Sequence, residues 1–151
     1  MATSSTVPKT AVYDFCIKGP GSFDGKASGA IIKGKIELNL DDQLHIGIGQ
    51  IGDHYASGSG GTFIAKKVGN EFIPLLVAGG AAGTDVNISQ DDMMMANAKI
   101  DEFGGNSSMN NAINEEKGSS GTCRYSTAHT AGAGFYSSPS LDNLVKVTVI
   151  D

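Results

Sequence analysis

Residues 62–78 read TFIAKKVGNEFIPLLVA, and this stretch predicts a β-hairpin. Two largely apolar arms, Thr62 to Val68 and Phe72 to Ala78, flank the dipeptide Gly69-Asn70. Both turn residues tolerate the positive φ angles that two-residue hairpin turns require. Pro74 has no backbone N–H, so the second arm should be an edge strand or carry a bulge at that residue.

The residues before the hairpin predict further strands. The first runs from Ala11 to Lys18 and ends at the turn signal Gly19-Pro20-Gly21. In the next, Ile36, Leu38 and Leu40 alternate with polar residues, which places the three aliphatic side chains on one face. The pair Asp41-Asp42 should then turn the chain.

The strand expected after this acidic pair has one aliphatic face and one nearly bare face. Its sequence, LHIGIG at residues 44–49, alternates aliphatic residues with His45, Gly47 and Gly49. Because glycine weakens a strand, such a row favours a place where another backbone packs closely or the sheet bends. His45 is interpreted as a solvated residue of the polar face. The run GGAAG at residues 79–83 is also suited to close backbone packing.

The remaining segments complete a single all-β domain that spans residues 1–151. Residues 1–10 should be frayed, because they begin with small polar residues. Ser89 and Asp92 resemble a capping pair ahead of good helix formers at Met93 to Phe103, which predicts one short helix. Residues 104–121 are interpreted as a mobile polar loop, and Leu144 to Ile150 as a closing strand. Short strands with glycine-rich turns favour a jelly roll or β-sandwich.

The composition argues against several classes of partner. A chain of 151 residues can bury a real core as one domain, and its 21 glycines are about twice the usual share. A net charge of −5 offers no electrostatic footprint for nucleic acid or anionic lipid. No apolar stretch approaches the roughly 20 residues of a membrane helix, and no leader sequence opens the chain. We therefore expect a cytoplasmic protein, or an extracellular one if the chain is a mature fragment.

The two cysteines, Cys16 and Cys123, are too few and too far apart for a disulfide scaffold or for the close pairs of a zinc site. Two buried thiols are the simpler interpretation, because free cysteine is often buried in protein cores. The alternative is a disulfide that ties the first strand to the last third of the chain. That disulfide requires an oxidising compartment.

Residues 47–52, GIGQIG, match the dinucleotide-binding pattern literally. That pattern holds a pyrophosphate only when a helix starts within the glycines, and the following residues 53–58 cannot open one. The three histidines lack the spacing of a metal site, no serine lies in a nucleophile elbow, and neither cysteine has a protease context. The sequence therefore predicts no enzyme, no cofactor and no metal.

A site for a polar ring is the functional hypothesis that the residue types favour. Asp53, His54 and Tyr55 combine acidic, imidazole and aromatic groups in one loop, and together they can hydrogen-bond to a sugar and stack on it. The alternative is ordinary loop surface. Residues from later segments are candidates to join this cluster: Tyr125, His129 and Tyr136.

Two stretches carry a resemblance to a known family: KIELNLDDQLHIGIGQIG at residues 35–52 and GGTFIAKKVGNEFIPLLVAGG at residues 60–80. Their order and spacing resemble the glycine-rich extracellular region of the anaplastic lymphoma kinase and leukocyte tyrosine kinase receptors. The resemblance covers about half the chain and implies a tumour-necrosis-factor-like jelly roll with glycine-rich segments. The family's long polyglycine tracts, cysteine-rich module, membrane span and kinase have no match here, so its ligand-binding residues are not carried over.

The leading functional hypothesis is a lectin-like recognition module that binds a glycan or a protein through loops at one end of a sandwich. The second is a self-assembling structural protein that packs through its glycine-bare strand face and its edge strand at Pro74. The third is receptor-type ligand binding, which requires export and oxidised cysteines. Homo-oligomers are expected under the second hypothesis.

Overall fold

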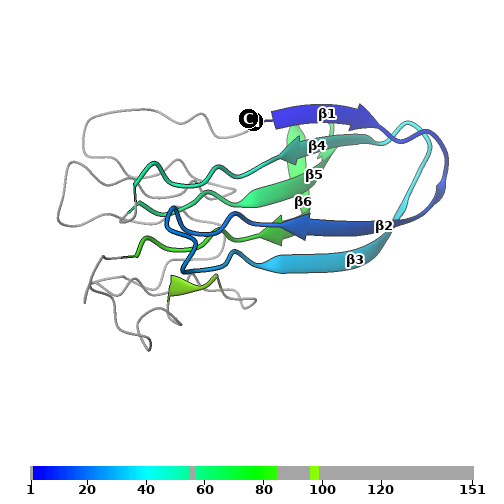
Figure 1. The fold of residues 1–151 in the computed structure, drawn as a ribbon. Helices are drawn as coiled ribbons and strands as arrows, with labels where there is room; N and C mark the ends of the chain where they lie inside the picture. Colours follow the sequence, from blue (N-terminus) through cyan, green and yellow to red (C-terminus); the bar gives the residue numbers. More distant parts are fainter. Residues whose placement is uncertain (1, 55–56, 85–95, 99–151) are drawn as a thin grey trace.

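The computed structural model describes residues 2–54, 57–84 and 96–98. Within these residues the chain forms six strands (Figure 1). The all-β class is therefore confirmed for the described part. The strands are β1 (Ala2–Thr6), β2 (Ala11–Lys18), β3 (Ile31–Leu38), β4 (Gln43–Gly47), β5 (Thr62–Val68) and β6 (Glu71–Ala78).

The strands form two antiparallel sheets that face each other. Four strands make one sheet in the order β1-β4-β5-β6, and β2 pairs with β3 in the other. Figure 1 shows the β2–β3 pair lying across the β5–β6 side of the larger sheet, and the closest approaches between the sheets are those of β2 and β3 to β5 and β6. This layering is consistent with a β-sandwich.

The core lies between the two sheets, and alternation along each strand creates it. In β2, every second residue points inward, ending at buried Ile17, which packs with Ile64 and Ala78. A second cluster forms from Val7, Leu38 and Leu44. Phe15 and Leu75 pack against both clusters and so make the core continuous.

The predicted hairpin is present, and both expectations for Pro74 are confirmed. β6 is an edge strand among the described strands, and the register shifts from Ile64 opposite Leu76 to Ala65 opposite Pro74. Leu75 is the extra residue of this bulge, and its side chain packs into the core. Of the two turn residues, Gly69 alone has a positive φ, of 63°, which matches a type II′ turn.

Several expectations for the first fifty residues need correction. The amino-terminal residues do not fray, because Ala2–Thr6 forms β1 and pairs with β4 in continuous register. The alternation of Ile36, Leu38 and Leu40 stops at the end of β3, and Leu40 is 55% exposed. It lies in a turn where Asp41 has a positive φ of 66°, so Asp41-Asp42 turns the chain as expected.

The following strand is also shorter than its alternation suggests. β4 ends at Gly47, and Ile48 is 51% exposed. His45 is half-buried rather than solvated: its ring meets that of Phe72 edge-on, with centroids 4.5 Å apart. Its Nδ1 also lies 3.3 Å from the Ser4 hydroxyl, so His45 joins β1, β4 and β6 on the outer face of the sheet.

The expectations for the last third of the chain lie largely outside the described residues. Of the predicted helix at Met93 to Phe103, the structure describes residues 96–98. The loop at 104–121 and the closing strand at Leu144 to Ile150 fall entirely beyond them.

Candidate functional site

Beyond the strand ends, glycine-rich segments continue side by side and form the end of the molecule opposite the β1–β2 and β3–β4 connections (Figure 1). We call residues 19–30, 48–54, 57–61 and 79–84 the glycine layer. One backbone hydrogen bond, Gly19 N–H to Ala30 O, closes the first segment on itself. The others run between different segments: Ala30 N–H to Gly79 O, Ala81 N–H to Pro20 O, Ser59 N–H to Ala81 O and Gly60 N–H to Gln50 O. Each segment is therefore held by at least one neighbour, and residues 79–81 by two neighbours through three hydrogen bonds.

The glycines allow this close packing, because a side chain would not fit between the segments. A Cβ atom on Gly19 would overlap the carbonyl oxygen of Gly79, and one on Gly49 would overlap that of Gly60. A Cβ on Gly80 would lie 2.5 Å from the carbonyl oxygens of Ser59 and Gly60. The expected close backbone packing is thus confirmed at Gly49 and at Gly80, and it takes place within the chain.

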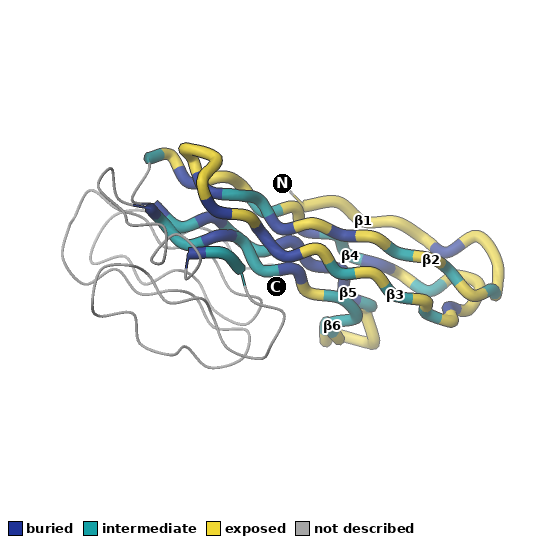
Figure 2. The backbone as a smooth tube through the Cα atoms, turned by 60° about the horizontal axis from the view of Figure 1, so that its bottom comes forward, coloured by how far each residue is buried: buried dark blue, intermediate teal, exposed yellow. Residues whose placement is uncertain are grey.

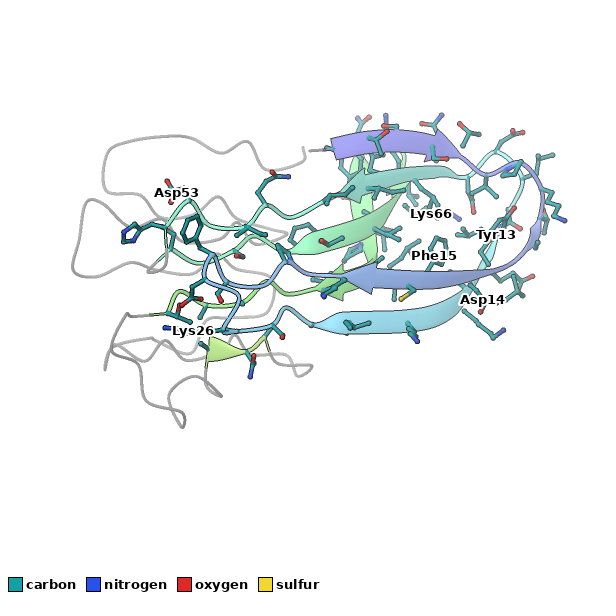
Figure 3. All side chains as sticks on the ribbon, in the orientation of Figure 1. Tyr13, Asp14, Phe15, Lys26, Asp53 and Lys66 are labelled. Carbon is teal, nitrogen blue, oxygen red and sulfur yellow. The ribbon has the colours of Figure 1, made fainter. Side chains whose placement is uncertain are left out.

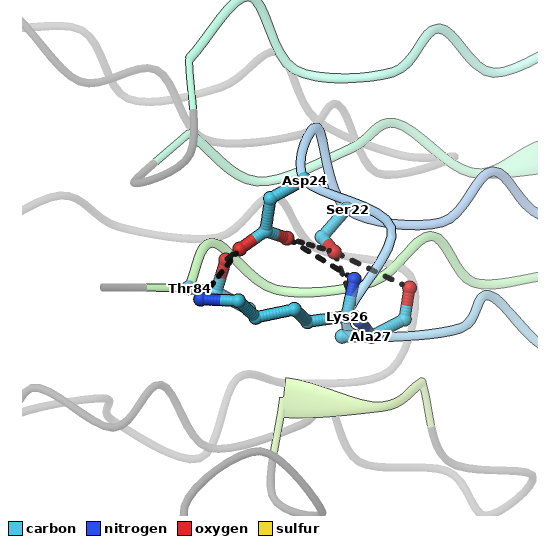
Figure 4. A network of polar contacts seen from close by, with 5 residues as sticks. All are labelled: Ser22, Asp24, Lys26, Ala27 and Thr84. Carbon is cyan, nitrogen blue, oxygen red and sulfur yellow. Dashed lines mark hydrogen bonds and ion pairs between the residues drawn. The ribbon is translucent and has the colours of Figure 1, made fainter. Parts of the chain in front are cut away.

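One carboxylate fixes the first loop of this layer (Figure 4). Asp24 Oδ1 accepts hydrogen bonds from the Ser22 hydroxyl at 2.7 Å and from the Lys26 N–H at 3.2 Å, while Oδ2 accepts from the Thr84 hydroxyl at 2.7 Å. Lys26 Nζ adds an ion pair at 3.4 Å. Ser22 and Thr84 are buried, so the network joins a loop to a segment 60 residues later in the chain.

The same network sets the protonation state of Asp24. Burial raises the pKa of its carboxyl, but the hydrogen bonds from Thr84, Ser22 and Lys26 outweigh that effect and lower the pKa to about 2. The carboxylate is therefore charged at neutral pH and acts as an acceptor. Sequence reasoning did not select Asp24. The local signal that could have indicated it is SFDG at residues 22–25, a turn in which Gly25 has a φ of 72°.

Hydrogen bonds from Ser57 hold the predicted residues Asp53 and His54 in a turn. The Ser57 hydroxyl donates to Asp53 Oδ1 at 2.8 Å, and the Ser57 N–H donates to the His54 carbonyl at 3.0 Å. Ser57 itself is fully buried, whereas Asp53 is exposed and His54 partly so. Figure 3 places Asp53 at the opposite end of the molecule from Tyr13 and Lys66.

One hydroxyl ties this turn to the first loop. Ser59 Oγ accepts a hydrogen bond from the Gly52 N–H at 3.1 Å and donates to the Gly21 carbonyl at 2.7 Å. Gly52 directly precedes Asp53, and Gly21 lies two residues before Phe23. Phe23 is 57% exposed, an aromatic ring in a loop that sequence reasoning did not select. We call Phe23, Asp53 and His54 the tip.

The other predicted binding residues are not brought together by the described part of the chain. Tyr55, Tyr125, His129 and Tyr136 all lie outside the described residues, so their convergence with Asp53 and His54 stays a prediction. Sequence reasoning found two residues of the tip and missed Phe23. It also missed Ser57 and Ser59, whose role depends on contacts across the fold.

Cys16 differs from its simpler interpretation. It is a free thiol, and it is exposed on the outer face of β2, opposite Lys33 of β3. The expectation of a buried thiol is therefore wrong for this cysteine, because Cys16 occupies the polar half of the alternation in β2. Its suggested disulfide partner, Cys123, lies outside the described residues.

Two searches of the described residues gave no site. They contain no group of three His, Cys, Asp or Glu side chains that could hold a metal ion. They also include no helix that is long and apolar enough to cross a membrane. Comparison with known proteins found no matching family model, no matching curated protein and no matching solved structure.

Proposed function

We propose that this chain is a non-enzymatic recognition module of jelly-roll type that binds a carbohydrate, as lectins do, through the tip. The observation that carries the proposal is the double anchoring of the tip. Ser57 fixes the turn that contains Asp53 and His54, and Ser59 ties this turn to the loop of Phe23. A site held in place before binding loses less conformational entropy when the ligand arrives.

The chemistry of the tip suits a sugar. A carboxylate and an imidazole hydrogen-bond to neighbouring hydroxyl groups, and an exposed aromatic ring stacks on the apolar C–H face of a pyranose. Phe23 supplies an exposed ring, and Asp53 and His54 supply the polar groups. Tyr55, the neighbour of His54, is proposed as a second aromatic contact.

The other two functions inferred from sequence have less support. Assembly through the glycine-bare face is disfavoured because Gly49 packs against Gly60 of its own chain. Assembly through the edge at Pro74 is disfavoured because the bulge at Leu75 interrupts that edge. Receptor-type ligand binding, with oxidised cysteines, lacks support among the described residues, because Cys123, the suggested partner of Cys16, lies outside them.

The test is binding of the labelled chain to a broad glycan array, followed by the same measurement on variants. Phe23→Ala and the double variant Asp53→Ala/His54→Ala should each weaken binding to the glycans selected by the unaltered chain at least tenfold, about 1.4 kcal/mol. Lys67→Ala is the matched control, because Lys67 is an exposed residue of β5 next to the hairpin turn. It should bind as the unaltered chain does.

Two results would contradict the proposal. One is an array on which the folded chain selects no glycan at all. The other is selective binding that the tip variants retain in full, which would locate the site elsewhere. Molecular mass measured by light scattering on the same samples separates a loss of binding from a change in assembly.

A further inference from the structure

The four-stranded sheet ends in two edges of different character. At one edge, β6 carries Pro74 and the bulge at Leu75. At the other edge, β1 has the sequence ATSST, with no proline and no charged residue, and its register with β4 is unbroken. Edge strands that lack such interruptions pair readily with another strand.

The surroundings of β1 leave this edge open. Among the described residues, β4 is the strand that pairs with β1, and no second neighbour pairs with its other side. All five of its residues are exposed, as the colouring along β1 in Figure 2 shows. Thr3 and Ser5 pair with Ile46 and Leu44, yet remain exposed because the β2–β3 sheet packs mainly on β5 and β6.

We propose that β1 pairs in antiparallel register with β1 of a second copy of this chain, about a two-fold axis at Ser4. This register places Ser4 opposite the partner's Ser4, Thr3 opposite the partner's Ser5 and Ala2 opposite the partner's Thr6. The inference is independent of the carbohydrate site, since it concerns a different part of the surface.

Charge favours pairing between copies at the β1 edge over pairing at the edges of the β2–β3 sheet. A chain with a net charge of −5 repels its own copies wherever acidic surfaces meet, but β1 brings no charge to the seam. The outer edges of the smaller sheet are different, because β2 and β3 carry Asp14, Lys18, Lys33, Lys35 and Glu37 on exposed positions. Opposed Ser and Thr side chains can hydrogen-bond across the new pair.

The interface is small, so the dimer should depend on concentration. Pairing of five-residue strands buries much less surface than the roughly 1,600 Å² of a standard stable interface. A closed two-fold pair uses the β1 edge of both copies, and the bulge interrupts the remaining β6 edges, so assembly stops at two copies. We therefore expect a monomer–dimer equilibrium without larger particles.

Disulfide trapping tests the register directly. In the full chain with Cys16→Ser and Cys123→Ser, the added substitution Ser4→Cys places two thiols directly opposite, with Cβ atoms about 5 Å apart. Mild oxidation should then yield a covalent dimer. Thr6→Cys in the same background is the matched control, because the two introduced thiols would lie about 13 Å apart along the strands, too far for a disulfide. An equimolar mixture of Ala2→Cys and Thr6→Cys chains should cross-link again.

Sedimentation equilibrium on the unaltered chain and two charge variants completes the test. Ser4→Lys opposes two like charges and should weaken dimerisation at least tenfold, whereas Ile73→Lys on the opposite edge should leave it unchanged. A chain that stays monomeric at the highest accessible concentration would overturn the proposal. So would Thr6→Cys cross-linking as fast as Ser4→Cys, or protection of the β1 edge by another part of the same chain. Thermal unfolding of each variant confirms that it is folded.

Discussion

Thr84 donates a hydrogen bond of 2.7 Å to the carboxylate of Asp24, 60 residues earlier in the chain. The contact joins the segment that follows β6 to the loop that presents Phe23. Since Ser22 binds the other carboxylate oxygen at 2.7 Å, Asp24 holds two buried hydroxyl groups at once. The position of the tip therefore depends on an acidic residue that does not belong to it.

Replacing that acceptor should destabilise the fold. In Asp24→Asn, one carboxylate oxygen becomes an NH₂ donor, so Ser22 or Thr84 loses its acceptor in a buried site. We expect the free energy of unfolding to fall by about 1–3 kcal/mol, measured by urea denaturation. Asp14→Asn is the matched control, because the Asp14–Lys35 ion pair is exposed, with side chains 76% and 73% accessible. The control should change stability by less than about 0.5 kcal/mol.

The lowered pKa of Asp24 also predicts how stability depends on pH. The unfolded carboxyl titrates near 3.8, and the folded one near 2. Between these values the unfolded chain binds a proton that the folded chain does not, so the stabilisation is complete above pH 3.8 and is lost as pH falls toward 2. The loss from this group is about 2 kcal/mol.

The dependence on pH can be assigned to Asp24 by comparing two variants. Asp24→Asn should flatten the acid limb of a plot of unfolding free energy against pH, and Asp14→Asn should not. Asp42 contributes with the same sign, because the hydrogen bond from Lys66 lowers the pKa of its carboxyl, so some acid sensitivity persists in Asp24→Asn. Identical acid limbs in both variants would refute the role of Asp24.

Two adjacent glycines of the glycine layer should respond differently to the same substitution. A Cβ on Gly80 would lie 2.5 Å from the carbonyl oxygens of Ser59 and Gly60, so Gly80→Ala should cost about 1–3 kcal/mol of stability. A Cβ on Gly79 would meet the Cβ of Ala98 at 3.7 Å, an ordinary contact. Gly79→Ala should therefore be neutral or stabilise by up to about 1 kcal/mol, since alanine restricts the unfolded chain. Equal losses in the two variants would mean that close backbone packing is not what selects glycine.

The strands could be predicted from sequence because their signals are local. The alternation in Ala11–Lys18 and the Gly69-Asn70 turn depend on neighbouring residues, and the structure reproduces both. Pro74 indicated an edge and a bulge for the same reason, since a missing N–H constrains pairing wherever it occurs. β1 was missed because its sequence, ATSST, has no apolar alternation and is ordered by pairing with β4.

The candidate site could be predicted only in part. Asp53 and His54 stood out by residue type, but their fixed position comes from Ser57 and Ser59, which look like ordinary loop serines in the sequence. Phe23 was not selected because an isolated phenylalanine in the loop GSFDG, residues 21–25, gives no sign of being exposed. Contacts such as Ser59 to Gly21, 38 residues apart, follow from the packing of the glycine layer and have no local signature.

Leu38 and Leu40 show where alternation stops being a guide to burial. Both continue one pattern in the sequence, yet Leu38 is 2% exposed and Leu40 is 55% exposed. β3 ends at Leu38, and the N–H of Leu40 is bonded to the Thr10 hydroxyl at 2.9 Å, so Leu40 belongs to the turn. Leu38→Ala should therefore cost about 2–5 kcal/mol, and Leu40→Ala less than about 1 kcal/mol, by urea denaturation. Comparable losses of stability at the two positions would mean that the strand and its inward face extend past residue 38 and that Leu40 belongs to the core.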